Sequence, residues 1–471
     1  MRGGTTDGGV AVDPYLRAMT RQPPHIVIAG GGVAAVEAVA ALRALVGAEP
    51  RITLLAPDTG LSTRAASVGA PFGFGVPGTL PFDVIRRHAP FDSHAGTLAQ
   101  IEPEARVAIT ADGARIGYDK LLVAVGARAL RAVPGAISFG GPADVPGVEQ
   151  AVGQTGRLAF VVPTASGWSL PAYELAIMAA VDLRDRGAAS QITVVTPEPE
   201  PLWVFGSEAG SAVAQLLAER GIALRTGTRG TAARAGALEV DFGPSVPAER
   251  VIALTRPAGP VIGGLPASPG GFVPVDDHGR VAGAPDVFAA GDATTFPLKQ
   301  GGLAAQQADA AAATIAAELG FDVDPSPFRP VLRGLLLTGG APLYLRAALS
   351  PAGRPEDSHA RRTGARPVGS VSRRALWWPP GKIAGRYLAP LLATARPSVL
   401  AAGELQDDHA GPAAEARDLA LLLADEEAAM GDFAQALHAL DAAAVLAGGG
   451  LSDEWNERRQ TWISAYRHSR A

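Results

Sequence analysis

The sequence has no cysteine among its 471 residues. It therefore cannot form a disulfide, bind a metal through thiolates, run a dithiol relay or use a cysteine nucleophile. We predict no metal site in the chain. Any redox chemistry that the protein carries out must rely on a bound cofactor, because the side chains that do such chemistry by themselves are missing.

The chain also lacks long apolar runs and an excess of basic charge. Charges such as Glu37, Arg43 and Glu174 interrupt each apolar stretch before it reaches the ~18 residues of a membrane span. The net charge of −5 argues against nucleic acid as a partner, since phosphate binding needs a basic face. Residues 1–24 contain no signal-peptide core and are expected to be a disordered tail. We expect a cytoplasmic protein without a transmembrane segment, with peripheral attachment to the inner face of the membrane as the alternative.

A glycine turn between a strand and a helix is the strongest feature that is present. It lies in the stretch HIVIAGGGVAAVEAVAAL at residues 25–42. Gly30 allows the sharp turn, Gly32 lets a pyrophosphate approach the backbone, and Ala35 keeps the helix close to the strand. A strand at residues 51–56 completes a βαβ unit, in which the first helical amides would face the phosphates. The pattern predicts a dinucleotide-binding fold.

The acidic residue that usually follows the second strand of such a unit is missing. The sequence reads LLAPD there, so Asp58 is the nearest residue that could bind a ribose hydroxyl, and its alternative role is that of a turn residue. Arg64 is the only charged residue of the loop-rich stretch 60–78. It lies either beside cofactor oxygens or in solvent, and the sequence leaves both alternatives open.

Two later segments fit the same fold. A buried strand runs into Gly126, where a sheet could contact a dinucleotide a second time. The string AAGDATTFPLKQGG ends a strand at Gly291 and Asp292 and begins a helix near Gly302. Lys299 stands just before this helix and is one of only three lysines in the chain. A lysine next to such a motif is therefore a candidate functional residue.

These segments, in this order, resemble the FAD-dependent pyridine nucleotide-disulfide oxidoreductase superfamily over roughly residues 25–400. The resemblance implies FAD as cofactor, with Gly126 in the A-x-G turn of the FAD domain and Asp292 bonded to the ribityl chain. It also implies that the helix near Gly302 points its N-terminus at the flavin pyrimidine. There Lys299, our candidate catalytic residue, would stabilise the negative charge of reduced flavin.

The segment GDATTFPLKQGGLAAQQ resembles one branch in particular, the type II NADH dehydrogenases and sulfide:quinone oxidoreductases. The resemblance implies a donor such as NAD(P)H and a quinone or another acceptor. Sulfide oxidation in that branch depends on cysteines and is excluded here. Two alternatives remain: a flavoprotein reductase with a donor other than a nicotinamide, and a non-enzymatic flavin-binding scaffold whose helical tail recruits a protein partner.

A second Rossmann-like unit is expected at residues 157–198, because its string QITVVTPE parallels RITLLAPD of the first unit. It has no G-x-G-x-x-G, and Pro163, Trp168 and Pro171 occupy the turn. The resemblance places NAD(P)H in this unit. Glu174 either meets a ribose or is simply a first-turn residue favoured by the helix dipole, and the sequence favours the second interpretation.

The predicted fold class is therefore α/β, with two Rossmann-like dinucleotide-binding domains. A pair of strands joined at residues 338–342 is expected to cover the flavin domain. The predicted segments are an N-terminal tail (1–24), an FAD-binding domain (25–150 and 272–325) split around an NAD(P)H-type domain (151–271), a C-terminal interface segment (326–400) and a helical hairpin (410–466) that offers a surface to a protein partner.

Overall fold

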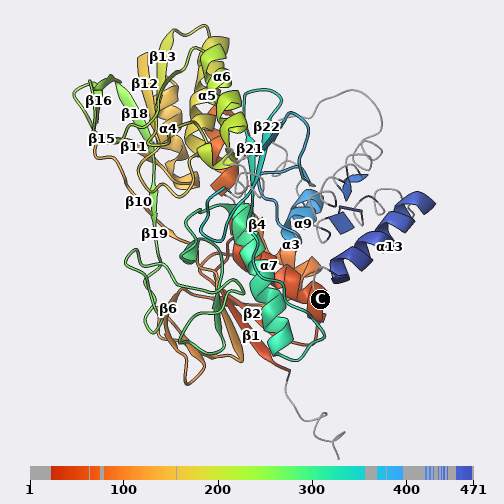
Figure 1. Cartoon of the computed structure of the whole chain (residues 1–471). Coiled ribbons are helices and arrows are strands. Elements are labelled where there is room, and N and C mark those ends of the chain that lie inside the picture. Colours follow the sequence, from red (N-terminus) through yellow and green to blue (C-terminus); the bar gives the residue numbers. More distant parts are fainter. Residues whose placement is uncertain are drawn as a thin grey trace, which may run out of the picture.

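The computed structural model describes residues 23–395 except 63, 75–78, 155, 356–368 and 378, together with parts of 420–468. It confirms the α/β class, with two separate parallel sheets joined by a narrow ribbon (Figure 1). The predicted tail lies outside the described residues except for its last two positions.

The first sheet has five parallel strands in the order β20-β9-β1-β2-β5. Its last strand in the sequence, β20, comes after the whole second sheet, so the first domain is split as the sequence predicts. The strands are β1 (His25–Ala29), β2 (Arg51–Ala56), β5 (Asp92–Ala95), β9 (Lys120–Val123) and β20 (Val287–Ala289).

Successive side chains of β1 pack on opposite faces of this sheet. Its β-branched residues favour a strand, and because successive side chains point to opposite faces, each face receives its own apolar layer. Ile26 and Ile28 pack against three helices, and Val27 and Ala29 pack against a small antiparallel sheet. The helices are α2 (Val33–Val46), α3 (Phe82–His88) and α7 (Gly301–Glu318), and the small sheet is β6 (Leu98–Glu102), β7 (Val107–Thr110) and β8 (Arg115–Gly117).

The second sheet is also parallel, in the order β11-β18-β12-β13-β14, with helices on one face and a short antiparallel sheet on the other. Its first strand precedes residue 150, so this unit begins earlier in the chain than the predicted boundary. Its strands are β11 (Ile137–Phe139), β12 (Gly156–Val161), β13 (Ser190–Val195), β14 (Ala223–Arg225) and β18 (Arg250–Leu254). Its helices are α4 (Val145–Val152), α5 (Leu170–Asp185) and α6 (Ser207–Glu219). The short sheet is β15 (Gly230–Arg234), β16 (Ala237–Val240) and β17 (Val246–Pro247).

The remaining elements connect or cover the two domains. Strands β10 (Arg128–Leu130) and β19 (Arg256–Ala258) form the antiparallel ribbon between the sheets, and β3 (Gly60–Ser62) pairs with β4 (Thr79–Pro81). Five 3₁₀ turns are η1 (Arg64–Val68), η2 (Ala70–Phe72), η3 (Pro142–Asp144), η4 (Trp203–Phe205) and η5 (Gly291–Ala293).

The C-terminal strands differ in one respect from the sequence-based expectation. The expected pair is present as β21 (Val331–Leu336) and β22 (Leu343–Ala348), with β23 (Ser370–Ser372) beside it. However, Leu332 and Leu345 share a buried cluster with Tyr173 and Phe205 of the second domain. The strands therefore cover the second domain as well as the flavin helix α7, because their apolar face meets both.

Two further helices follow in the described part of the chain. Helix α9 (Leu388–Ala395) packs on α2 and α3. Helix α13 (Asp453–His468) contributes Trp462 to a small cluster with Ala424, Ala436 and Leu440. The rest of the predicted hairpin at 410–466 is described only in part, so the hairpin stays a prediction. No helix in the described ranges is long and apolar enough to cross a membrane.

Candidate functional site

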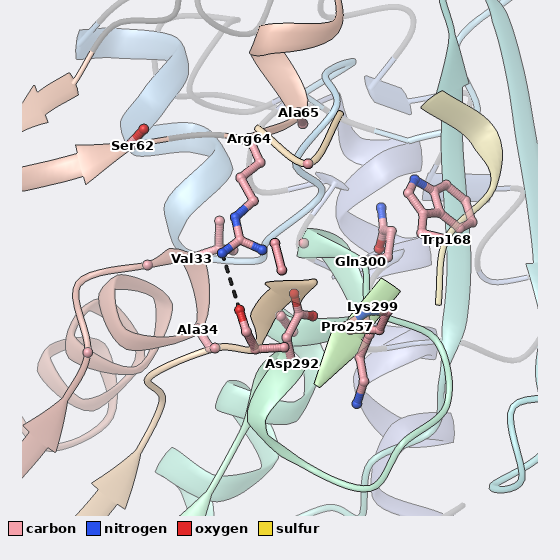
Figure 2. A pocket seen from close by; sticks show the side chains of 18 of the residues that line it. Val33, Ala34, Ser62, Arg64, Ala65, Trp168, Pro257, Asp292, Lys299 and Gln300 are labelled. Carbon is pink, nitrogen blue, oxygen red and sulfur yellow. Dashed lines mark hydrogen bonds between the residues drawn. The ribbon is translucent and has the colours of Figure 1, made fainter. Parts of the chain in front are cut away.

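A cavity of about 550 Å³ lies at the carboxyl ends of the strands of both sheets (Figure 2). Its walls include residues that follow the strands directly: Gly30 after β1, Ala124 after β9, Ala290 after β20 and Thr255 after β18. Parallel sheets leave their ligand crevices at this edge. The volume is also that of a typical cofactor pocket.

The glycine turn forms one end of this cavity. Gly30 has a φ of +127°, and a Cβ placed on it would collide with the carbonyl oxygen of Ala124. A Cβ on Gly32 would instead meet no atom within 4 Å, because it would point into open space. Helix α2 begins at the next residue, so its first amides have no partners inside the helix. This end is a cradle that a phosphate group could fill. Ala35 lies behind it in the core.

Asp58, Arg64 and Gly126 all line the cavity, as the sequence-based assignments require. Asp58 is exposed at the rim, next to the end of β2. The Arg64 guanidinium points inward toward the region of Asp292 in Figure 2, and its Nη2 donates a hydrogen bond to the carbonyl oxygen of Ala127 at 3.4 Å. Gly126 has a φ of +73° and, like Gly32, has no atom within 4 Å of where a Cβ would lie.

Asp292 projects its carboxylate into the middle of the cavity in Figure 2. Within the described part of the chain, no group donates a hydrogen bond to it. Burial raises the pKa of this carboxyl, while the charges of Lys299 and Arg64 oppose that rise. An acceptor held in this way is suited to bind a hydroxyl group of a ligand.

Gly291 and Gln307 fix the turn that carries Asp292. The Gln307 side-chain oxygen accepts hydrogen bonds from the Gly291 amide at 2.8 Å and the Thr294 hydroxyl at 3.0 Å. Gly291 has a φ of +75° and packs against Ala34 of α2, where a Cβ would come within 3.0 Å. Its role is close packing rather than lining of the cavity. Gln307 was not assigned this role from sequence, because its partners lie outside its own helix.

Lys299 lines the cavity, but its ammonium group points away from Arg64 and Trp168 in Figure 2. The Nζ donates to the carbonyl oxygens of Thr294 and Phe296, both at 2.6 Å, and lies 4.1 Å from the centre of the Phe272 ring. Burial lowers the pKa of Lys299 to about 8. The predicted stabilisation of reduced flavin by this residue remains a prediction.

The N-terminus of α7 reaches the cavity next to Lys299. Gln300 caps this helix, because its side-chain oxygen accepts a hydrogen bond from the Leu303 amide at 2.9 Å. Gly301 and Ala304 line the cavity, whereas Gly302 does not. A Cβ on Gly302 would approach the side-chain oxygen of Gln300, so the structure places this predicted cofactor residue behind the cap.

A buried ion pair forms another part of the cavity wall. Glu174 of α5 is fully buried, and its Oε1 lies 2.5 Å from Nζ of Lys382 and accepts a hydrogen bond from the Leu337 amide at 2.8 Å. Its Oε2 has no hydrogen-bond partner among the described residues. Burial raises the pKa of this carboxyl, against the opposing charge of Lys382. The sequence favoured a simple first-turn role for Glu174 and gave no sign that Lys382 pairs with it.

The turn of the second domain has no comparable cradle. Gly167 has a φ of +73°, and a Cβ on it would lie 2.9 Å from Cγ of Lys299, so the loop packs directly on the flavin domain. Its carbonyl oxygen accepts a hydrogen bond from the Lys299 amide at 3.0 Å. Trp168 of the same loop lines the first cavity. The loop therefore forms a wall of that cavity.

Glu198 stands just after β13, where a Rossmann unit usually carries its ribose-binding acid. Its carboxylate accepts hydrogen bonds from the hydroxyls of Ser169 at 2.9 Å, Tyr173 at 2.7 Å and Thr196 at 3.0 Å. Burial raises its pKa. The domain thus uses its own hydroxyls to satisfy this acid. The parallel between TPE at 196–198 and APD at 56–58 is a sequence signal that could have identified this acid. The sequence gave no sign of its three hydroxyl partners.

The chain belongs to the pyridine nucleotide-disulphide oxidoreductase family, whose pattern matches residues 24–313. The fold is similar to that of sulfide:quinone oxidoreductase from the hyperthermophilic bacterium Aquifex aeolicus, with a TM-score of 0.65, 20% identity and coverage of 74% of this chain and 86% of that one. It is also similar to the ferredoxin reductase for the CYP199A2 system from Rhodopseudomonas palustris, with a TM-score of 0.56, 20% identity and coverage of 69% and 83%. Putidaredoxin reductase in its covalent complex with putidaredoxin matches with a TM-score of 0.54, 18% identity and coverage of 70% and 85%.

Membership of this family implies FAD, and the cavity fits it. The open space in front of Gly32 and the free amides of α2 suit the pyrophosphate. The Asp292 carboxylate is available to a ribityl hydroxyl. The wide region between Lys299, Trp168 and the Glu174–Lys382 pair is left for the flavin ring.

Proposed function

We propose that this protein is an FAD-dependent oxidoreductase that passes electrons from a small-molecule donor to a quinone or another small acceptor. The observation that carries the proposal is the continuous cavity between the glycine turn and the Glu174–Lys382 pair. Bound flavin supplies the redox chemistry, because it can accept two electrons and pass them on. The protein then has to bind the cofactor, exclude water and manage protons.

The residues of the cavity divide these tasks. Gly32 and the first amides of α2 would hold the pyrophosphate, and Asp292 would orient the ribityl chain. Glu174 can take up and release a proton at Oε2, because burial raises its pKa and that oxygen has no partner among the described residues. Lys382 keeps Oε1 of the same carboxyl in place. The carboxyl would thus supply a proton within the cavity, where an acceptor such as a quinone would need one.

The structure of the second domain favours a donor other than a nicotinamide. Its turn has no open glycine cradle, Pro171 at the start of α5 has no amide hydrogen, and Glu198 already accepts three hydrogen bonds. NAD(P)H is the second candidate donor. It is favoured by family membership and by the order β12, α5, β13, which is that of a Rossmann unit.

Anaerobic titration of the purified protein tests both parts of this proposal. Heat denaturation should first release a flavin that chromatographs as FAD. NADH and NADPH should then leave the absorbance of the bound flavin unchanged, while dithionite bleaches it. Rapid bleaching by either nucleotide would mean that the donor is NAD(P)H. A colourless protein that cannot be reconstituted with FAD would contradict the proposal as a whole.

The helical tail supports a different, non-enzymatic candidate. Trp455 and Trp462 of α13 stack edge to face at 6.3 Å beside a small apolar cluster that is separate from the flavin domain. Under this alternative the flavin protein is a scaffold and the tail recruits a protein partner. Capture of a partner by the full-length protein but not by one truncated before residue 410, with no turnover by any donor, would favour the scaffold.

A further inference from the structure

Residues 381–388 form a strap that runs from the cavity wall to helix α9. Lys382 and Ile383, in its first half, line the cavity, and Lys382 pairs with Glu174 of the second domain. Its second half leads into α9, which packs on the flavin domain. The position of the Lys382 ammonium therefore depends on how the strap is held a few residues further along the chain.

Glu37 of α2 is the group that holds this second half. Its side chain is fully buried, and its two oxygens accept hydrogen bonds from the amides of Tyr387 at 2.7 Å and Leu388 at 2.8 Å. The amide of Arg386 lies near this carboxyl and also favours its charged form. Burial raises the pKa of Glu37, and these backbone donors oppose that rise by favouring the ionised form. The strap thus wraps a buried carboxylate of the cofactor-binding helix.

Gly385 shows how closely the strap approaches this carboxylate. A Cβ placed on Gly385 would collide with Oε2 of Glu37. The contact requires glycine because no side chain fits between the strap and the carboxylate. A substitution at Gly385 therefore displaces the strap without removing the Glu37 carboxylate.

Asp309 of α7 adds a second buried carboxyl, whose side chain hydrogen-bonds to that of Glu37. Its Oδ1 has no partner among the described residues. Two adjacent buried carboxyls cannot both be ionised at low cost, so one must keep a proton. Because Glu37 receives the backbone amides, the proton belongs to Asp309. Burial and the charge of Glu37 raise the pKa of Asp309 well above its ordinary value, and Arg386 is the charged strap residue that opposes this rise.

We propose that Glu37 and Asp309 share one proton and act as positioning residues, which clamp the strap where Lys382 reaches the cavity. The clamp joins α2 and α7, two of the helices whose N-termini face the cavity, to the strap. The inference rests on the proposed function only in treating the cavity as the reaction site.

The clamp is sensitive to pH in one direction. The pKa of Asp309 is raised in the folded protein, so its contribution to strap docking is complete at low pH and is lost as the pH rises through that pKa. Above it, two ionised carboxylates repel each other, and the charge of Arg386 and the backbone amides on Glu37 offset this only in part. The strap should then be released, and Lys382 should leave Glu174.

Hydrogen exchange of the strap in the FAD-loaded protein, read by mass spectrometry at neutral pH, tests the clamp. Glu37→Gln should make the Tyr387 and Leu388 amides exchange roughly tenfold faster or more, since the charged acceptor is lost. Asp309→Asn is the matched variant. Its amide imitates a protonated Asp309, so protection at neutral pH should be kept and the alkaline loss of protection seen in the parent should disappear.

Release of the strap by Asp309→Asn at neutral pH, or full protection in Glu37→Gln, would overturn the clamp. If Glu37→Gln does not fold, Gly385→Ala replaces it, and full protection in that variant would count equally against the proposal. Exchange is measured without donor or acceptor and at verified FAD occupancy. A protein that fails to turn over would therefore refute the proposed function but not the clamp.

Discussion

Gly30 and Gly32 stand two residues apart in one turn, yet they face different surroundings. Gly30 lies against the backbone of β9, and Gly32 faces the open cavity. Gly30→Ala should therefore destabilise the folded protein through backbone collision and a strained φ. Gly32→Val should unfold at the temperature of the parent apoprotein but lose FAD. Thermal unfolding and fluorescence titration with FAD check the two outcomes. Tight FAD binding by Gly32→Val would mean that this turn is not the phosphate-binding site.

Lys299 allows a second test at the level of one side chain. If its charge acts on bound flavin, Lys299→Met should lower the midpoint potential by about 30 mV, which corresponds to ~1.4 kcal/mol for a two-electron couple. With a pKa of about 8, the charge is present below that pH and lost above it. The potentials of parent and variant should therefore differ at pH 6.5 and converge at pH 9.5. Equal potentials at both pH values in spectroelectrochemical titration would restrict Lys299 to its bonds with the carbonyl groups.

The buried pair between α5 and the strap is a feature of the elements that it joins. Glu174→Gln leaves the Lys382 ammonium without its counter-ion, and removal of one partner of a buried pair typically costs about 3–5 kcal/mol. Urea unfolding should show this loss, and the double variant Glu174→Gln/Lys382→Met should recover part of it. The exposed pair Arg51–Asp92 is the control, because Arg51→Gln should cost less than ~1 kcal/mol. Equal effects of the two single variants would mean that the buried pair does not join the elements.

At the scale of the whole molecule, the cavity takes its walls from both domains and from the C-terminal segment. A ligand that fills it should therefore stabilise these parts together. At a concentration of FAD 100 times its Kd, the free energy of unfolding should rise by about 2.7 kcal/mol. Differential scanning calorimetry of the apoprotein and the FAD-loaded protein should show one transition that shifts as a unit. If FAD shifted only one of several unfolding transitions, the binding would be assigned to the first domain alone.

The sequence by itself determined the features that are local. A β-branched strand, a glycine turn and an alanine-rich helix follow one another at residues 25–42, so Gly30, Gly32 and Ala35 could be assigned from spacing alone. The parallel between RITLLAPD and QITVVTPE likewise disclosed the second Rossmann-like unit. Periodicity and turn chemistry act over a few residues, and such signals can be read without knowing the fold.

Only the tertiary structure decided how distant residues meet. Lys382 pairs with Glu174, which lies 208 positions earlier, and the amide of Leu388 bonds to Glu37, 351 positions earlier. Glu174 appeared to be an ordinary first-turn residue and Glu37 one charge in an apolar helix, because their sequence neighbours give no sign of a partner. The physical reason is that a buried carboxylate is stable only when donors surround it, and the folded chain brings those donors together from separate segments.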